Sequence, residues 1–100
     1  MDKNFLPTLG LARRAGKVLL GVDSIREYRK PVALLIYASD ASPRVRRVLS
    51  DRKEPFLTPE LTKAQLGSAV GCKEAAVIAV TDAGFAGIIR KKFELQEDNA

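Results

Sequence analysis

The chain has 100 residues, 46% hydrophobic and 29% charged, so it is long enough for one apolar core and too short for two. Seventeen Lys and Arg residues against twelve Asp and Glu residues give a net charge of +5, and the isoelectric point is about 9.7. The single cysteine and the absence of histidine exclude an intramolecular disulfide and a Cys/His zinc site, and they remove the commonest general base.

The basic balance is typical of nucleic-acid-binding domains, although it also serves solubility alone. The N-terminus has no basic region followed by an apolar run, and no stretch reaches the ~18 apolar residues that a membrane span needs. We therefore expect a cytoplasmic protein without a membrane partner. Residues 1–100 are expected to form a single domain, with residues 94–100 as a frayed acidic tail.

The first element predicted is a helix. Asn4 can cap it, Pro7 then falls in its first turn, and Gly16 is a natural left-handed stop. Arg13 and Arg14 lie in the last turn, where cations stabilise a helix by a few tenths of a kcal/mol up to ~1 kcal/mol. Helix stabilisation explains either arginine taken alone.

A short strand over residues 17–20 and a second helix are expected next. Because Pro31 cannot continue a helix, this helix must end near Arg29. Residues 24–27 fit a capping box, but a start there leaves barely one turn, so we place the start near Gly21 or Val22.

Two continuous apolar runs, residues 32–38 and 75–80, predict strands that are covered on both faces. Pro43 begins a helix between them, which directs Val45, Val48 and Leu49 inward and leaves its arginines (Arg44, Arg46 and Arg47) exposed. Residues 55–57 predict a brief strand.

The last third of the chain carries two more helix signals. A capping box over residues 62–65 begins a short helix that stops at Gly71. Thr81 or Asp82 caps a final helix, with its apolar side chains inward (Phe85, Ile88 and Ile89). This alternation predicts a three-layer α/β/α sandwich of about four strands. Open sheets bind ligands beyond strand ends, which draws attention to Gly21 and Gly71.

The usual catalytic motifs are missing. Gly10 and Gly16 are one residue too far apart for a P-loop, and neither G-x-G-x-x-G nor G-x-S-x-G occurs. Asp40 and Asp82 follow apolar strands, but each also stands where turns and helix caps favour aspartate. Cys72 lacks a histidine to activate it. We expect no catalytic residue, no metal site and no cofactor.

Two blocks of sequence carry a family resemblance, LGLARRAGKVLLG at residues 9–21 and LGSAVG at residues 66–71. Over residues 4–91 the chain resembles the kink-turn RNA-binding ribosomal proteins of the L-seven-Ae and L-thirty-e type, in particular the small bacterial YlxQ-like members. The resemblance implies an L-thirty-e-like sandwich with a mixed sheet. It also implies an RNA-binding domain without enzymatic activity, which grips a sharply bent duplex with tandem sheared G·A pairs.

In this family, a Gly-x-Asn-Glu-x-x-Lys type pattern at the start of the second helix contacts the G·A pairs. Carried over, the glycine is Gly21, the amide position is Asp23, the Glu or Gln position is Ser24, and the lysine position is Glu27. The family's second contact loop, which packs against the bulged nucleotide, falls on residues 71–75.

From these matches we expect an RNA site that combines base readout, phosphate contacts and an apolar surface for an unstacked base. It comprises Lys17, Gly21, Val22, Asp23, Ser24, Arg26, Glu27, Cys72, Lys73, Glu74 and Ala75. Asp23 and Ser24 read base edges, while Lys17, Arg26 and Lys73 neutralise phosphates. The expected partner is structured RNA, including ribosomal RNA, bound by a monomer alongside ribosomal or other RNA-associated proteins.

Two further classes of function stay open. Glu27 replaces a lysine and Glu74 adds another negative charge, and both departures favour a protein-interaction module that uses the basic faces against an acidic partner. The other class is an enzyme that acts on a small ligand. The sequence favours it less, because Asp40 and Asp82 are the only residues that support it.

Overall fold

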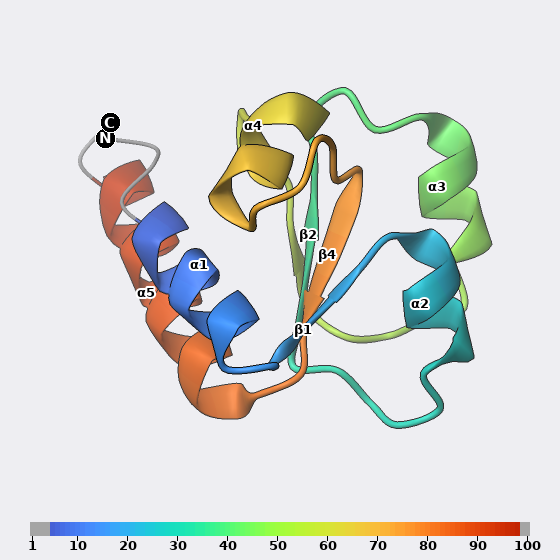
Figure 1. Cartoon of the computed structure of the whole chain (residues 1–100), viewed down its shortest axis with the longest axis horizontal. Coiled ribbons are helices and arrows are strands. Elements are labelled where there is room, and N and C mark those ends of the chain that lie inside the picture. The colour runs from blue at the N-terminus through green and yellow to red at the C-terminus, as the bar shows by residue number, and fades with distance from the viewer. Residues whose placement is uncertain (1–4, 99–100) are drawn as a thin grey trace.

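The computed structural model describes residues 5–98, with side chains described to residue 93. In chain order the elements are α1 (Leu6–Arg14), β1 (Val18–Leu20), α2 (Val22–Glu27), β2 (Leu34–Tyr37), α3 (Pro43–Val48), β3 (Phe56–Leu57), α4 (Lys63–Ala69), β4 (Val77–Val80) and α5 (Ala83–Asp98). Figure 1 shows how they are arranged in space.

The sheet has four strands in the order β1-β4-β2-β3. β4 pairs antiparallel with both β1 and β2, whereas β2 and β3 are parallel, so the sheet is mixed. β2 and β4 occupy the centre, and all their residues are buried, which is why their sequences read as unbroken apolar runs. The predicted fold class, a three-layer sandwich with a mixed sheet of about four strands, is confirmed.

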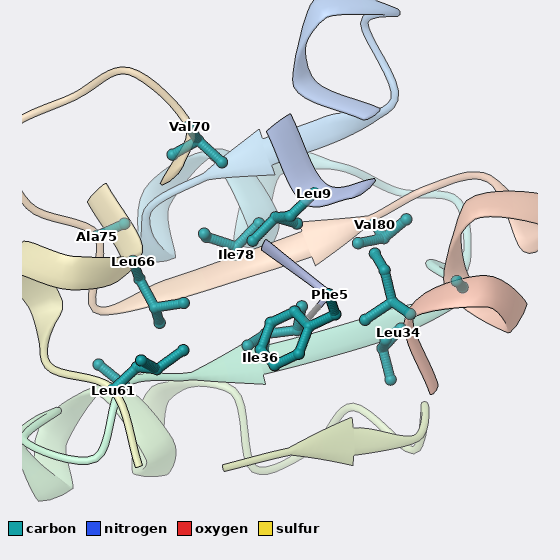
Figure 2. Packing of buried hydrophobic residues seen from close by; sticks show 13 residues of the cluster. Phe5, Leu9, Leu34, Ile36, Leu61, Leu66, Val70, Ala75, Ile78 and Val80 are labelled. Carbon is teal, nitrogen blue, oxygen red and sulfur yellow. The ribbon is translucent and has the colours of Figure 1, made fainter. Parts of the chain in front are cut away.

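The helices form the two outer layers. α1, α4 and α5 cover one face of the sheet, and α2 and α3 cover the other (Figure 1). Between the sheet and the first group lies the larger apolar cluster, in which Phe5, Leu9 and Leu66 are fully buried against β2 and β4 (Figure 2). Ile25 and Leu49 lie in the cluster on the opposite face. Each helix is therefore attached to the sheet by its own apolar side chains.

Most predicted helix ends are confirmed. The side chain of Thr62 accepts from the amide of Gln65, and the Gln65 side chain accepts from the amide of Thr62, which completes the capping box of α4. Pro43 is the first residue of α3, and Asp82 caps α5. Asn4, predicted to cap α1, lies outside the described residues.

The predicted start of α2 near Gly21 or Val22, preferred over a capping box at residues 24–27, is confirmed. α2 begins at Val22 with Gly21 in the cap position, and no side chain caps it. Because Gly21 already turns the chain into the helix, Ser24 falls inside the first turn instead of before it. Ser24 and Glu27 are both exposed to solvent. The capping box therefore does not explain the presence of these two polar residues.

Two side chains differ from their predicted exposure. Ile88 was expected to face the core, but 48% of it is exposed, because the buried face of α5 follows Ala86 and Ile89. Arg46 was expected on the exposed arc of α3, but it is half-buried: its guanidinium lies 4.7 Å from the centre of the Tyr37 ring and donates to Thr58 Oγ1 at 2.9 Å. This geometry is a cation–π contact.

The C-terminal helix α5 continues to Asp98, into the segment 94–100 for which the sequence predicts fraying. Within residues 5–98, none of the helices combines the length and the apolar character that crossing a bilayer requires.

Candidate nucleic-acid interface

Gly21 makes the turn from β1 into α2. Its φ of 87° and ψ of 157° lie in a region that only glycine adopts readily. The Gly21 amide donates to the Val77 carbonyl at 3.1 Å, and its own carbonyl accepts from the Ile25 amide at 3.3 Å. A Cβ atom at Gly21 would meet nothing within 4 Å, so glycine is required here by the backbone conformation and not by a lack of space.

α2 is short, and one turn of it is anchored in the core. Ile25 is fully buried and Val22 is half-buried against the same apolar cluster. The remaining side chains of its outer arc are exposed, namely Asp23, Ser24, Arg26 and Glu27. Three of them (Asp23, Arg26 and Glu27) line, with Arg29, a shallow depression of about 460 Å³. This surface carries two carboxylates and two guanidinium groups.

The 71–75 loop is folded tightly against α4. The Cys72 amide donates to the Gly67 carbonyl at 2.8 Å, and the Ala75 amide donates to the Lys63 carbonyl at 3.0 Å. Gly67 permits this approach, because a Cβ atom there would lie 2.7 Å from Glu74 Cα. Ala75 is buried, while Lys73 and Glu74 are exposed. The loop is thus a fixed platform that presents one positive and one negative side chain.

The start of α2 and the 71–75 loop lie at the same end of the sheet. The loop leads directly into β4. Val77, the first residue of β4, accepts the hydrogen bond from the Gly21 amide. Leu20, the last residue of β1, pairs with Ile78 of β4. The two segments predicted to form one site are therefore joined through β4, although about fifty residues separate them in sequence.

Lys17 is not part of this group. It precedes β1, at the end opposite Gly21, so the length of β1 separates it from α2. Its carbonyl accepts from the amide and the hydroxyl of Thr81, at 2.8 and 3.1 Å, where β4 ends. Four residues of extended chain span roughly 13 Å. The prediction that Lys17 stands with Arg26 and Lys73 around the start of α2 therefore does not match its position.

The aspartates considered as catalytic candidates serve as caps. Asp40 Oδ1 accepts from the Lys63 amide at 2.8 Å, at the start of α4, and Asp82 Oδ2 accepts from the Phe85 amide at 2.9 Å. Because β2 and β4 are antiparallel, the two carboxylates lie at opposite ends of the sheet. Among the residues that the structure describes, no group of three or more Cys, Asp and Glu residues is placed to hold a metal ion.

The C-terminal end of α2 is held by a residue that sequence reasoning missed. The guanidinium of Arg52 donates to the carbonyls of Ile25, Tyr28 and Lys30 at 3.3, 3.5 and 3.2 Å. It also binds both carboxylate oxygens of Glu54. The Ile25 carbonyl also accepts from the Tyr28 amide at 3.2 Å, so Arg52 adds a charged donor to a helix end that the backbone satisfies only in part. A basic residue near an acidic one, LSDRKEP, was the only signal in the sequence.

Glu54 completes this arrangement. One of its oxygens also accepts from the Val32 amide at 3.1 Å. Burial by itself would raise the pKa of the Glu54 carboxyl, but the hydrogen bonds from Val32 and Arg52 favour the ionised form and hold this pKa below its usual value. The Arg52–Glu54 pair therefore links α2, the connection to β2 and the segment after α3, and it sets the position of α2.

The chain is similar to known proteins in sequence and in fold. No family model matches the chain. Over 88 residues, however, the chain is 40% identical to the RNA-binding protein YlxQ of Bacillus subtilis (strain 168), a match that covers 82% of the chain and 87% of the relative. The chain belongs to the YlxQ family. The resemblance expected from residues 9–21 and 66–71 is confirmed.

Solved structures share the fold of this YlxQ-family protein. A Bacillus halodurans protein described as having unknown function is 29% identical, with a TM-score of 0.76 over 93% of this chain and 99% of that one. The 15.5kD RNA binding protein of Giardia lamblia is 19% identical, with a TM-score of 0.66 over 90% of this chain and 84% of that one. At 19% identity the second likeness shows the fold alone.

Proposed function

We propose that this YlxQ-family protein binds RNA, and that it recognises kink-turn-like structured RNA associated with the ribosome. The observation that carries the proposal is the hydrogen bond from the Gly21 amide to the Val77 carbonyl, because it joins the start of α2 to β4, the strand into which the 71–75 loop leads. The B. subtilis relative, itself an RNA-binding protein, supports the RNA partner. The protein acts in the cytoplasm as a monomer, without catalysis.

Base readout is assigned to the first turn of α2. Asp23 and Ser24 are exposed and lie directly after Gly21, whose open surroundings let RNA approach the backbone. A carboxylate accepts hydrogen bonds from guanine N–H groups, and a hydroxyl can donate or accept. In this proposal the two side chains contact the edges of the sheared G·A pairs.

The phosphate contacts come from both segments of the site. Arg26 in α2 and Lys73 in the loop are both exposed cations. Phosphate contacts position RNA without reading its sequence. Lys17, at the far end of β1, contributes only to RNA that extends beyond this turn.

The unstacked nucleotide is assigned to the surface between α2 and the loop. Val22 and Cys72 are half-buried and expose part of their apolar atoms, while Ala75 is buried and contributes through its backbone. Because the loop is held by hydrogen bonds to Gly67 and Lys63, it presents this surface without rearranging.

A protein-interaction module remains the second candidate, and one observation favours it. The depression beside α2 contains the carboxylates of Asp23 and Glu27 as well as two arginines, and Glu74 is exposed in the loop. Glu27 stands where the family carries a lysine and repels phosphate instead of attracting it. A mixed-charge surface of this kind suits a protein partner as well as it suits RNA.

The deciding experiment compares a labelled kink-turn RNA with the same RNA in which Watson–Crick pairs replace the G·A pairs, at two salt concentrations. We expect a preference for the kink-turn that Asp23→Ala abolishes. Glu60→Ala removes an exposed carboxylate elsewhere and should preserve the preference. Equal, salt-sensitive binding of both RNAs would contradict kink-turn recognition and leave only electrostatic attraction.

A further inference from the structure

A second concave surface lies between α1 and α4, on the face of the sheet opposite α2. It measures about 430 Å³ and runs from the C-terminal end of α4 along α1. Gly10 brings the two helices close together, since a Cβ atom at Gly10 would lie 3.1 Å from the Ala69 carbonyl oxygen. Leu11, 54% exposed, adds apolar surface. We call this surface the α1–α4 groove.

The charge of this groove distinguishes it from three other concave surfaces of the described residues. Arg13 and Arg14 line it, both are exposed, and no acidic residue lies among its lining residues. The depression beside α2 includes Asp23 and Glu27, and two depressions near Arg52 include Asp51. Among the described residues, neither Arg13 nor Arg14 takes part in a salt bridge.

The helix ends reduce this charge without cancelling it. The C-terminal turns of α1 and α4 both border the groove, and a helix C-terminus carries up to about half a negative charge. Two such ends against two guanidinium groups leave a net charge of about +1. The helix termini therefore offset only part of the positive charge of the two arginines. The remaining positive charge attracts an anion.

Lys17 extends the same basic area. Its amide donates to the Ala12 carbonyl at 2.9 Å, so the backbone at Lys17 lies at the end of α1, and its side chain is exposed. At the other end, Gly71 belongs both to the groove and to the 71–75 loop. The groove is thus continuous with one half of the candidate interface and leads toward three exposed cations, Arg13, Arg14 and Lys17.

We propose that the α1–α4 groove binds the sugar–phosphate backbone of an RNA strand that continues from the kink-turn past the 71–75 loop. Arg13, Arg14 and Lys17 neutralise its phosphates, and Leu11 with the exposed backbone contacts its riboses. The inference rests on the proposed function. It adds that the bound RNA continues beyond the kink-turn into the groove. Continuity at Gly71 favours RNA over an acidic peptide, because a strand leaving the loop enters the groove directly.

The test uses a minimal kink-turn RNA and versions of it with ~10-nucleotide single-stranded extensions on either end of the bulged strand. The variant Arg13→Gln/Arg14→Gln removes two positive charges from the groove. The matched control, Arg44→Gln/Arg47→Gln, removes two exposed arginines from α3 in the opposite layer. Ser68→Glu adds a negative charge on the α4 side of the groove and tests the same surface without removing an arginine. Circular dichroism establishes that each variant folds.

We expect the unaltered protein to bind one extended RNA more tightly than the minimal one. Loss of two single-strand phosphate contacts should weaken binding of that RNA about tenfold near 0.15 M salt and lower the salt slope by about 1.4. The affinity of the groove variant for the minimal RNA should change less than about twofold. The affinity of the α3 control variant for the extended RNA should also change less than about twofold.

Other outcomes separate the two hypotheses. If no kink-turn RNA is bound specifically, the proposed function fails, and the inference fails with it. If the minimal RNA binds but extensions add nothing, or the α3 control weakens binding as much as the groove variants, the inference alone is overturned. Binding of a poly-glutamate peptide that depends on Arg13 and Arg14, with RNA binding unaffected, would also overturn it in favour of an acidic protein partner.

Discussion

Arg52 donates two hydrogen bonds to Glu54, from Nε to Oε1 at 3.2 Å and from Nη2 to Oε2 at 2.8 Å. Both side chains are mostly shielded from solvent, with 16% and 14% of their surface exposed. The same guanidinium donates to three carbonyls at the end of α2 and beyond it. The pair therefore acts as a tether that fixes α2, although neither residue belongs to the candidate interface.

Arg52→Ala should lower the free energy of unfolding by about 2–3 kcal/mol, because it leaves Glu54 and the α2 carbonyls without their charged donor. Urea denaturation measures this change. Arg52→Lys should recover little, since an ammonium group cannot make the same planar, forked contact. Full stability in Arg52→Lys would show that charge alone, and not the hydrogen-bond geometry, matters at this position.

The lowered pKa of Glu54 predicts how stability depends on pH. A carboxyl whose pKa is lower in the folded state stabilises the fold above its unfolded pKa, ~4.3, and loses that contribution as pH falls through the folded value. The difference in unfolding free energy between the unaltered protein and Glu54→Gln should thus be constant from about pH 8 to 5 and shrink below about pH 4. Urea midpoints at these pH values test it. A difference that grows on acidification would mean that the pKa of Glu54 is raised, and not lowered, in the folded state.

Gly67→Ala should displace the 71–75 loop. The new Cβ atom would lie 2.7 Å from Glu74 Cα, and both groups belong to the packed backbone, so one must move. We expect a loss of about 2–3 kcal/mol in stability and weaker RNA binding. Gly87→Ala is the matched control, because its Cβ atom meets nothing within 4 Å in α5, and it should stabilise the helix by up to ~1 kcal/mol. Unchanged RNA affinity in a folded Gly67→Ala protein would remove the loop from the interface.

Gly21→Ala tests the turn into α2. No atom stands in the way of the added methyl group, so the cost comes from the backbone conformation alone, about 1–3 kcal/mol. We expect the start of α2 to shift and kink-turn RNA to bind more weakly, as measured by fluorescence anisotropy. Gly16→Ala imposes a similar positive-φ strain before β1 and should reduce stability without changing the affinity for a minimal RNA. Equal loss of affinity in both variants would indicate a general effect of instability.

Much of the fold follows from local patterns. The two apolar runs predict the central strands, and the capping residues Thr62 and Asp82 predict where α4 and α5 begin, because each of these signals acts within a few residues. Ile88 was assigned to the wrong side, since helical spacing places Ile88 and Ile89 next to each other on the boundary of the apolar face.

The candidate interface was predicted only in part. Residues 21–24 and 71–75 could be paired from the family resemblance, but the contact that joins them depends on β1 lying beside β4, which no local signal specifies. The same strand order places Lys17 beside Thr81 and away from α2. Arg52 was missed because its partners at α2 lie 22 to 27 residues away in sequence.

The attachment of both contact segments to β4 has a thermodynamic consequence. β4 is hydrogen-bonded on both sides and buried on both faces, so it belongs to the last part of the molecule to open. The Gly21 turn and the 71–75 loop are tied to the same end of this strand, and they can separate only when the sheet itself comes apart. An RNA that binds there meets a preorganised backbone, and its affinity is not reduced by an entropy cost of ordering these two segments of main chain.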